Sequence, residues 1–577
     1  MTMLTKWGAV LDRSCPLPEY PRPQLRRESF YNLNGVWDYA VTPSGDEPEV
    51  WDGEIVVPFS PEAPLSGAAR GPAKDEYLHY RRGFTLPEGF QKSRVLLHFG
   101  AVDQIAEVFV NGVSAAKHSG GYWPFSADIT SLLREGENIL RVTVRDNADD
   151  PTFAYGKQRY KRGGMWYTAQ SGIWQTVWLE SVPEVYVKSL RITPEFDEAR
   201  VRIELETALE SGAAITCDVR AADGSFVAGS WAKGGVCVVP LPGFRAWTPD
   251  DPYLYTLDIT CGDDRVESYF AMRKFSYVEL GGRKVFGLNN APLFHNGLLD
   301  QGYYPDGLLT PPSDEAMVND IETMKRCGFN MLRKHIKIEP LRWYYHCDRL
   351  GMIVWQDMVS GGQPYSFLHV SALPTLGKVD LPDQDAKPYG RSGVLSRARF
   401  RREMADTVRL LYNCPCIALW TVFNEGWGQF DALDMANELK KLDPTRFIDH
   451  ASGWQDQGYE EMKSRHIYFR PVKLKNDGRA LALTEYGGYI LAVDGHRWTD
   501  KVFGYRICRD SAALAHDYEK LMLGQVLPHI RKEGLTAAVY TQITDVEEEL
   551  NGLMTYDREV LKIPEETLRE INEQLKF

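Results

Sequence analysis

Hydrophobic and polar residues alternate in short runs over the first third of the chain. A period of two predicts β-strands that bury one face, and turn-forming residues separate the runs. Together these strands predict a β-sandwich or jelly roll over residues 1–183. The clearest runs are VLLHFG (95–100), AEVFVNG (106–112), ILRVTV (139–144) and TVWLE (176–180).

The same strand-like rhythm continues over residues 184–275, where the runs are short and regularly spaced. About 90 residues with this spacing predict a second, smaller domain, an Ig-like β-sandwich. Its expected strands include VRIELET (201–207), AITCDVR (214–220), VCVVPLP (236–242) and YLYTLDIT (253–260).

The pattern changes near residue 276, because apolar runs now alternate with helical stretches up to residue 577. This alternation predicts a C-terminal (β/α)₈ TIM barrel, whose chemistry lies at the carboxyl ends of its strands. The eight expected strands are 293–299, 329–335, 352–357, 417–423, 446–451, 465–469, 480–486 and 536–543.

One barrel helix and one long loop are marked in the sequence. Ser313 is a candidate N-cap, apolar residues follow at helical spacing, and Gly328 is expected just past the end of the helix. The stretch 364–395 is rich in proline and glycine, so we expect it to be a loop over the active face.

Two glutamates follow apolar strands at positions that face a barrel mouth. Glu425 comes after IALWTVF (417–423), and Glu485 ends ALALTEY (480–486). Either residue alone is more often a solvated loop residue, but the joint pattern predicts the carboxylate pair of a glycoside hydrolase. Asn424 is then placed to hold a substrate hydroxyl, and Trp427 to wall the pocket and raise the pKa of the acid.

Composition narrows the function classes. A formal charge of −13 argues against binding nucleic acid or an anionic membrane. No apolar run is long enough for a membrane span, and the first residues do not resemble a signal peptide. Nine scattered cysteines suggest reduced thiols and a cytoplasmic protein, and their spacing predicts no metal site.

The sequence resembles glycoside hydrolase family 2, which includes β-galactosidases, β-glucuronidases and β-mannosidases. The resemblance spans essentially the whole chain, including SGIWQTVWLE (171–180) and LFHNGLLDQGYYPDG (293–307). FNEGWGQ resembles the family's acid/base motif and TEYGG its nucleophile motif. The resemblance implies Glu425 as proton donor, Glu485 as nucleophile and no required cofactor. Some relatives bind magnesium near the acid, but no confident ligand set is present in this chain.

The resemblance also implies roles around the two carboxylates. Tyr468 is expected to contact the nucleophile and Arg333 to hold one of the two glutamates by a charged hydrogen bond. Further candidates for substrate contacts, each with core packing or an ion pair as the plain alternative, are His295, His335, Asp357, Tyr486, Trp498 and, from the first domain, Asp146.

The identity of the sugar rests on fewer residues. β-Glucuronidases of the family hold the sugar carboxylate with an Asn-x-Lys motif, and the comparable place here has Asn551-Gly552-Leu553, without the lysine. Three cations, Arg470, Lys473 and Lys475, follow the sixth strand and are candidate ligands of a uronate, with a solvated loop as the equal alternative.

The sequence therefore predicts an exo-acting, retaining β-glycosidase for galacto-configured sugars, with a preference for β-D-galacturonides. A β-galactosidase, a β-glucuronidase or another family 2 β-glycosidase is the alternative, and a non-catalytic carbohydrate-binding protein is the rival from another class. The expected partner is a carbohydrate or glycoconjugate, and a homo-oligomer is left open.

Overall fold

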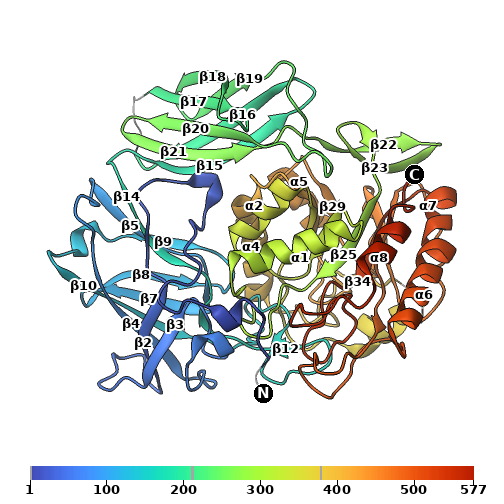
Figure 1. The fold of residues 1–577 in the computed structure, drawn as a ribbon, viewed down its shortest axis with the longest axis horizontal. Coiled ribbons are helices and arrows are strands. Elements are labelled where there is room, and N and C mark those ends of the chain that lie inside the picture. Colours follow the sequence, from blue (N-terminus) through green and yellow to red (C-terminus); the bar gives the residue numbers. More distant parts are fainter. Residues whose placement is uncertain (1–2, 210–213, 377–379) are drawn as a thin grey trace.

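The computed structural model describes residues 3–209, 214–376 and 380–577. Figure 1 shows three bodies in chain order: a β-sandwich in blue, a smaller sandwich in green, and a barrel that runs from yellow-green to red. This order of jelly roll, Ig-like sandwich and barrel confirms the predicted fold class. The boundaries at residues 183 and 275 stay predictions.

The first body packs two antiparallel sheets around a continuous apolar core. Alternate residues of the outer strands point inward, as in β7, whereas β10 in the middle of its sheet is mostly buried on both faces. One sheet has the order β3 (Gly53–Val57), β2 (Gly35–Thr42), β4 (Tyr77–Thr85), β10 (Glu137–Arg145), β7 (Ile105–Val110), β8 (Val113–Ser119). The other has the order β1 (Tyr31–Asn32), β14 (Val177–Val182), β5 (Arg94–Phe99), β9 (Phe125–Asp128).

The second body is a seven-stranded sandwich with strict inside–outside alternation, for example in β20 (Tyr255–Cys261). All nine cysteines of the chain are free thiols, and Cys217, Cys237 and Cys261 lie in this core as small apolar residues. One sheet is β15 (Val187–Glu195), β16 (Arg200–Thr207), β19 (Val236–Pro240). The facing sheet is β18 (Phe226–Lys233), β17 (Ala214–Arg220), β20, β21 (Asp264–Phe270).

Eight parallel strands form the barrel, one at each segment expected from the sequence. The ladder runs through all of them but does not join β29 to β30, so the barrel is nearly closed. The sixth strand lies about two residues earlier than expected, at β30. The strands are β25 (His295–Asp300), β26 (Met331–Lys334), β27 (Ile353–Asp357), β28 (Ile417–Thr421), β29 (Phe447–Asp449), β30 (Met462–Ile467), β31 (Ala480–Gly487) and β34 (Leu535–Thr541).

Helices cover most but not all of the barrel. Ser313 caps α1 through Ala316 N–H, and Gly328 adopts φ +86° past its end, so both predicted signals are confirmed. The connections after β29 and after β30 contain no helix among the described residues, which departs from a full (β/α)₈ pattern. The helices are α1 (Asp314–Arg326), α2 (Leu341–Leu350), α4 (Val394–Leu411), α5 (Ala432–Leu442), α6 (Ser511–Leu521), α7 (Leu527–Glu533) and α8 (Glu565–Asn572).

The loop predicted at 364–395 contains two short helical elements, η5 (Leu368–Ala372) and α3 (Leu373–Thr375). Residues 377–379 lie outside the described part. The loop packs on the turns that follow β28 and β29: Gly428 N–H after β28 donates to Tyr389 O, and Gln455 Nε2 after β29 donates to His369 O. No helix among the described residues combines the length and the apolar character that a bilayer span needs.

The amino-terminal end of the barrel is closed by a small sheet of β22 (Phe275–Leu280), β23 (Arg283–Leu288) and β24 (Ala291–Pro292). Phe286 of β23 stacks on Phe447 with ring centroids 4.3 Å apart and contacts Trp355. This plug keeps water out of one end of the barrel, so the carboxyl ends of the strands form its open mouth.

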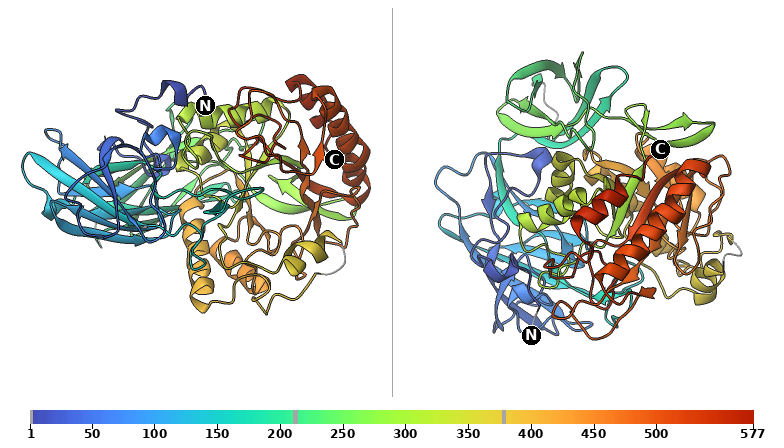
Figure 2. Two further views of the ribbon diagram at one scale, coloured as in Figure 1. Left: turned by 90° about the horizontal axis from the view of Figure 1, so that it is seen from below. Right: turned by 45° about the vertical axis from the view of Figure 1, so that its right-hand side comes forward.

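A segment of the jelly roll reaches across to this mouth. Residues 153–170 include β11 (Gln158–Arg159) and β12 (Tyr167–Thr168), and Figure 1 places β12 beside the barrel, away from the blue sheets. Figure 2 shows the two bodies side by side in both further views. Tyr155 N–H and Gly156 N–H both donate to Ser360 O of the barrel, which fixes the segment there.

A buried carboxyl in the jelly roll makes its stability depend on pH. Asp103 is 3% exposed, and burial raises its pKa to about 7 although Gln158 Nε2 donates to it. Between about pH 4 and pH 7 the unfolded chain loses this proton while the folded chain keeps it, so stability falls as pH rises. We expect Asp103→Asn to raise the apparent Tm at pH 8 by roughly 3 °C or more, and to change nothing near pH 4.

Scanning calorimetry at both pH values tests this. Asp38→Asn, at a half-exposed carboxylate on β2, is the matched control and should change Tm equally at both. An Asp103→Asn Tm difference that is the same at pH 4 and pH 8 would contradict the assignment.

Candidate active site

Glu425 lies just past β28 on a backbone turn that L-residues rarely adopt. The φ angle of Glu425 is +53°. Its N–H donates to Ser452 O at 2.9 Å, and its carbonyl oxygen accepts from Trp454 Nε1 at 2.9 Å. Such strain persists only where surrounding contacts impose it, and it is common at functional sites. The turn carries the side chain into the barrel mouth.

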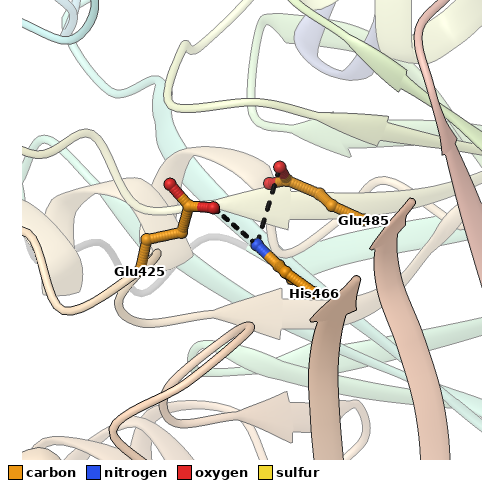
Figure 3. Close-up of side chains that lie close together, drawn as sticks. All are labelled: Glu425, His466 and Glu485. Carbon is orange, nitrogen blue, oxygen red and sulfur yellow. Dashed lines mark hydrogen bonds and ion pairs between the residues drawn. The ribbon is translucent and has the colours of Figure 1, made fainter. Parts of the chain in front are cut away.

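Glu485 arrives from the neighbouring side of the mouth, on β31. In the parallel ladder its Cα pairs with that of His466 on β30. Figure 3 shows both glutamates directed toward the same imidazole nitrogen: Glu425 Oε1 lies 2.8 Å and Glu485 Oε2 3.6 Å from His466 Nδ1. One carboxylate oxygen of each glutamate and this nitrogen lie within 4.8 Å of one another.

The two glutamates have different surroundings. The Glu425 side chain is 22% exposed and Glu485 only 6%. Burial of its carboxyl group raises the pKa of Glu425, although the charges of Lys157 and Arg333 act in the opposite direction. A carboxyl with a raised pKa keeps its proton to higher pH, which suits a proton donor.

Glu485 instead accepts two hydrogen bonds from side chains of the barrel. Arg333 Nη1 donates to Oε1 at 3.1 Å, and Tyr468 Oη donates to Oε2 at 2.5 Å. Two donors aimed at one carboxyl group fix its direction, as a nucleophile requires. The two glutamates therefore differ in their hydrogen-bond partners as well as in their burial.

Arg333 is fully buried and connects the Glu485 side of the site to the Glu425 side. Its Nε donates to Asp357 Oδ1 at 3.0 Å and its Nη2 to Asn424 Oδ1 at 2.8 Å. The second Asp357 oxygen lies 2.7 Å from His335 Nδ1. Burial alone would raise the pKa of Asp357, but Arg333 and His335 lower it to about 2. Asp357 is thus an ion-pair partner with both oxygens occupied.

Two polar groups of this network stay available to a ligand. Because Arg333 takes Asn424 Oδ1, the Asn424 Nδ2 group has no protein partner in the part of the chain that the structure describes. His335 is bound to Asp357 through Nδ1, and burial lowers its pKa, so its ring is neutral with Nε2 free to contact a hydroxyl. Both suit sugar hydroxyls.

Loss of the tyrosine hydroxyl gives a direct test of this geometry. Tyr468→Phe removes the donor to Glu485 but keeps the ring that stacks on Tyr505 at 4.0 Å. A hydrogen bond to a charged group contributes about 1.5–3 kcal/mol, so kcat/KM on an aryl β-glycoside should fall by roughly 10- to 100-fold.

The matched control is Tyr489→Phe, which removes a phenol hydroxyl four residues after Glu485 without touching it. It should keep kcat/KM within about twofold, an energy below a single neutral hydrogen bond. Equal kcat/KM for Tyr468→Phe and the parent protein would show that the contact contributes nothing.

Comparison with known proteins gives three matches to models of one family. The sugar-binding domain of glycosyl hydrolases family 2 matches residues 64–183, a second family 2 domain matches 185–273, and the family 2 TIM barrel domain matches 311–474. The chain belongs to glycosyl hydrolases family 2. The resemblance found in the sequence is confirmed.

Known family 2 proteins that are similar to this chain carry different sugar names. A β-galactosidase of Thermoanaerobacter pseudethanolicus is 25% identical over 387 residues, which cover 64% of this chain and 47% of that protein. The chain thus spans about half the length of this curated relative. A β-glucuronidase from an uncultured Clostridium sp. has the same fold, with a TM-score of 0.74 and 19% identity over 96% of this chain and 99% of the other.

A third relative is a family 2 β-galacturonidase from Eisenbergiella tayi, solved bound to galacturonate. Its TM-score is 0.70, with 18% identity over 97% of this chain and 100% of the other. At such identities the likeness shows the fold alone, so the sugar must be argued from the residues of this chain.

Three cations that the sequence offered as ligands of a uronate, Arg470, Lys473 and Lys475, are exposed. Among the residues that the structure describes, no contact joins them to the two carboxylates. The backbone of this stretch is held by Gln525, which accepts from Val472 N–H, and by Glu533, which accepts from Asn476 N–H. Their role as ligands of a uronate stays a prediction, and their exposure is also what the solvated loop, the equal alternative, would give.

The two predicted tryptophans pack against other aromatic and cationic groups. Trp427 is buried and contacts Trp166 edge-on at 5.1 Å, so it forms part of an apolar wall beside the turn that carries Glu425. Trp498 lies under the Arg162 guanidinium at 4.2 Å. One face of Trp498 is therefore taken by a cation of the jelly-roll segment.

The remaining candidates are core groups. Asp146 is buried in the jelly roll beside a cavity lined by Glu62 and Ser171, and burial raises its pKa well above the usual range. No contact joins it to the barrel carboxylates among the described residues. His295 is fully buried with Trp355 Nε1 donating to Nδ1, and Tyr486 is also fully buried, so both have the packing role given as the alternative.

Sequence reasoning missed His466, which contacts both glutamates. Burial lowers its pKa to about 3, so the ring is neutral. With the sixth strand placed two residues late, its pairing with Glu485 was hidden. His466, Glu425 and Glu485 are also the one group in the described ranges whose ligand atoms lie close enough to hold a metal ion.

Two jelly-roll contacts at the mouth were missed as well. Tyr167 Oη donates to Glu549, which follows β34, and burial raises the pKa of Glu549. Lys157 faces the same mouth, and its charge acts on Glu425, His335 and Glu549. No strand-end pattern marks these residues, because they come from another domain.

Proposed function

We propose that this protein is an exo-acting, retaining β-glycosidase in which Glu425 is the acid/base and Glu485 the nucleophile. The observation that carries this is the approach of the two carboxylates, with one oxygen of each within 4.8 Å. Retaining enzymes place these groups about 5 Å apart, whereas inverting enzymes need roughly 6.5–9.5 Å to admit a water molecule.

The first step breaks the glycosidic bond. Glu425 gives its proton to the leaving oxygen, and the Glu485 carboxylate attacks the anomeric carbon to form a covalent glycosyl-enzyme. Arg333 and Tyr468 hold the attacking carboxylate in place, and they disperse its charge as it becomes a leaving group in the second step.

The second step releases the sugar. Glu425, now ionised, takes a proton from a water molecule that attacks the anomeric carbon and frees Glu485. Asn424 Nδ2 supports both steps as a donor to a ring hydroxyl, because Arg333 fixes the direction of its amide.

For the substrate we propose a terminal β-linked sugar of galacto configuration, with β-D-galacturonide preferred and β-D-galactoside as the alternative. The missing lysine at Asn551-Gly552-Leu553 argues against a glucuronide. Relatives named β-galactosidase and β-galacturonidase support a galacto sugar. A β-glucuronidase or another family 2 β-glycosidase is the less favoured outcome.

Turnover of a panel of aryl β-glycosides tests the proposal. The panel holds galactoside, galacturonide, glucuronide, mannoside and arabinopyranoside, and the galacturonide should give the highest kcat/KM. If another glycoside of the panel gave the highest kcat/KM, the proposed substrate would change, but the proposed mechanism would stand. Binding of sugars without turnover of any glycoside would instead support a non-catalytic carbohydrate-binding protein.

A further inference from the structure

Lys157 is a jelly-roll residue held rigidly over the barrel mouth. The preceding residue, Gly156, donates its N–H to Ser360 O of the barrel, and Tyr167 N–H donates to the carbonyl of Lys157 itself. The residue is only 9% exposed. Its backbone is therefore fixed at both domains, and its side chain extends into a largely enclosed space.

The charge of Lys157 faces three different strand ends. It lowers the pKa of Glu425 after β28, of Glu549 after β34 and of His335 after β26. Because these residues come from separate strands of the barrel, the charge of the ammonium group acts across the mouth. Its position is fixed by the backbone contacts with both domains and by the Trp166 ring, whose centroid lies 5.6 Å from Nζ.

This ammonium group has no counter-ion. It makes no hydrogen bond or ion pair with residues 3–209, 214–376 or 380–577, and its one close aromatic neighbour is Trp166, with the ring centroid 5.6 Å away. Glu549 does not neutralise it, since Tyr167 occupies that carboxyl group and burial favours its protonated form. An unpaired, buried cation is costly, and such groups are paired by a ligand when one is present.

We propose that Lys157 binds the carboxylate of a uronic acid sugar and so gives the protein its preference for acidic over neutral sugars. This inference rests on the proposed glycosidase function and deepens it. Of the Lys and Arg side chains whose charge acts on Glu425, Lys157 is the one without a protein partner in the described ranges, since Arg333 is fully occupied by Asp357, Asn424 and Glu485.

The proposal also explains the missing family lysine. Asn551-Gly552-Leu553 offers no cation from the barrel, and Arg470, Lys473 and Lys475 make no contact with the two glutamates among the described residues. In this proposal a cation from the jelly roll takes the role of the missing lysine.

The test compares Lys157→Met with the matched control Lys161→Met, an exposed lysine four residues along the same segment. Substrates are 4-nitrophenyl β-D-galacturonide and 4-nitrophenyl β-D-galactoside, which differ at the sugar carboxylate. Lys157→Met should lower kcat/KM for the galacturonide by roughly 100-fold or more, chiefly through KM, as loss of a buried charge pair does. The galactoside should lose much less, by an amount that reports the shared effect of the Lys157 charge on the pKa of Glu425, and Lys157→Arg should recover part of the galacturonide activity.

Several outcomes would overturn the inference while leaving the glycosidase function intact. These are equal losses on both substrates, no loss on the galacturonide, or a parent protein that prefers the galactoside. Turnover of neither substrate would count against the proposed function instead. In that case calorimetry tests the role of Lys157 directly, by measuring the affinity of free galacturonate and galactose for the parent protein and for Lys157→Met. Equal affinity of both proteins for galacturonate would overturn that role.

Discussion

Glu485→Ala should abolish turnover, with kcat on an aryl β-glycoside falling by about 10⁶-fold, the loss typical of removing a covalent nucleophile. The physical reason is that the covalent intermediate cannot form, while Arg333 and Tyr468 remain as donors around an empty space. Azide added at high concentration should enter that space and attack from the same face. The product should then be the α-glycosyl azide.

The configuration of the azide product shows whether Glu485 or another group attacks the anomeric carbon. Stopped assays measure the loss, and NMR of the azide adduct gives its configuration. The variant must keep the parent's apparent Tm, since Glu485 is buried and its loss leaves a cavity. A β-glycosyl azide from Glu485→Ala, or a loss below about 100-fold, smaller than a nucleophile's contribution, would show that another group attacks the anomeric carbon.

Glu425→Gln should have the second largest effect, and its size should depend on the leaving group. The amide keeps the shape and the contact with His466 but has no proton to donate. On glycosides with basic leaving groups kcat/KM should fall by about 10²–10⁴-fold, the usual contribution of general acid catalysis. On a 2,4-dinitrophenyl glycoside, which needs no proton, kcat/KM should change little.

Burst kinetics separate the role of Glu425 as proton donor in the first step from its role as base in the second. Because the same residue activates water, the 2,4-dinitrophenyl substrate should give a fast burst followed by slow turnover as the glycosyl-enzyme accumulates. Glu438→Gln on α5, whose carboxylate lies 3.8 Å from Arg401, is the matched control and should behave as the parent protein. Equal losses on both kinds of leaving group would contradict the assignment.

The sequence predicted the features that are encoded within a single strand or helix. Alternating burial, cap signals at Ser313 and Gly328, and carboxylates at strand ends are local, so the three bodies and the placement of Glu425 and Glu485 could be predicted. Which side chains contact Glu485 could be established only from the three-dimensional structure. Arg333 reaches it across the barrel, and His466 is paired with it only in the register that the structure gives.

Charge in a loop gives a weaker prediction than a carboxylate at a strand end. Lys473 and Lys475 are close in sequence to the mouth, but they are exposed and no contact joins them to the two glutamates among the described residues. Lys157 lies about 270 residues before Glu425 in the chain and reaches the site only because the jelly roll docks on the barrel. Contacts between domains leave no periodic signal in either one, so sequence patterns could not predict them.

The central claim is that Glu425 and Glu485 converge on one anomeric carbon in the geometry of a double displacement. Proton NMR of the first-formed sugar, recorded within the first turnovers and before mutarotation, tests it most directly. The account predicts the β-anomer, since two inversions retain the configuration. The α-anomer as first product would require a single displacement by water and would contradict the pairing of these two carboxylates.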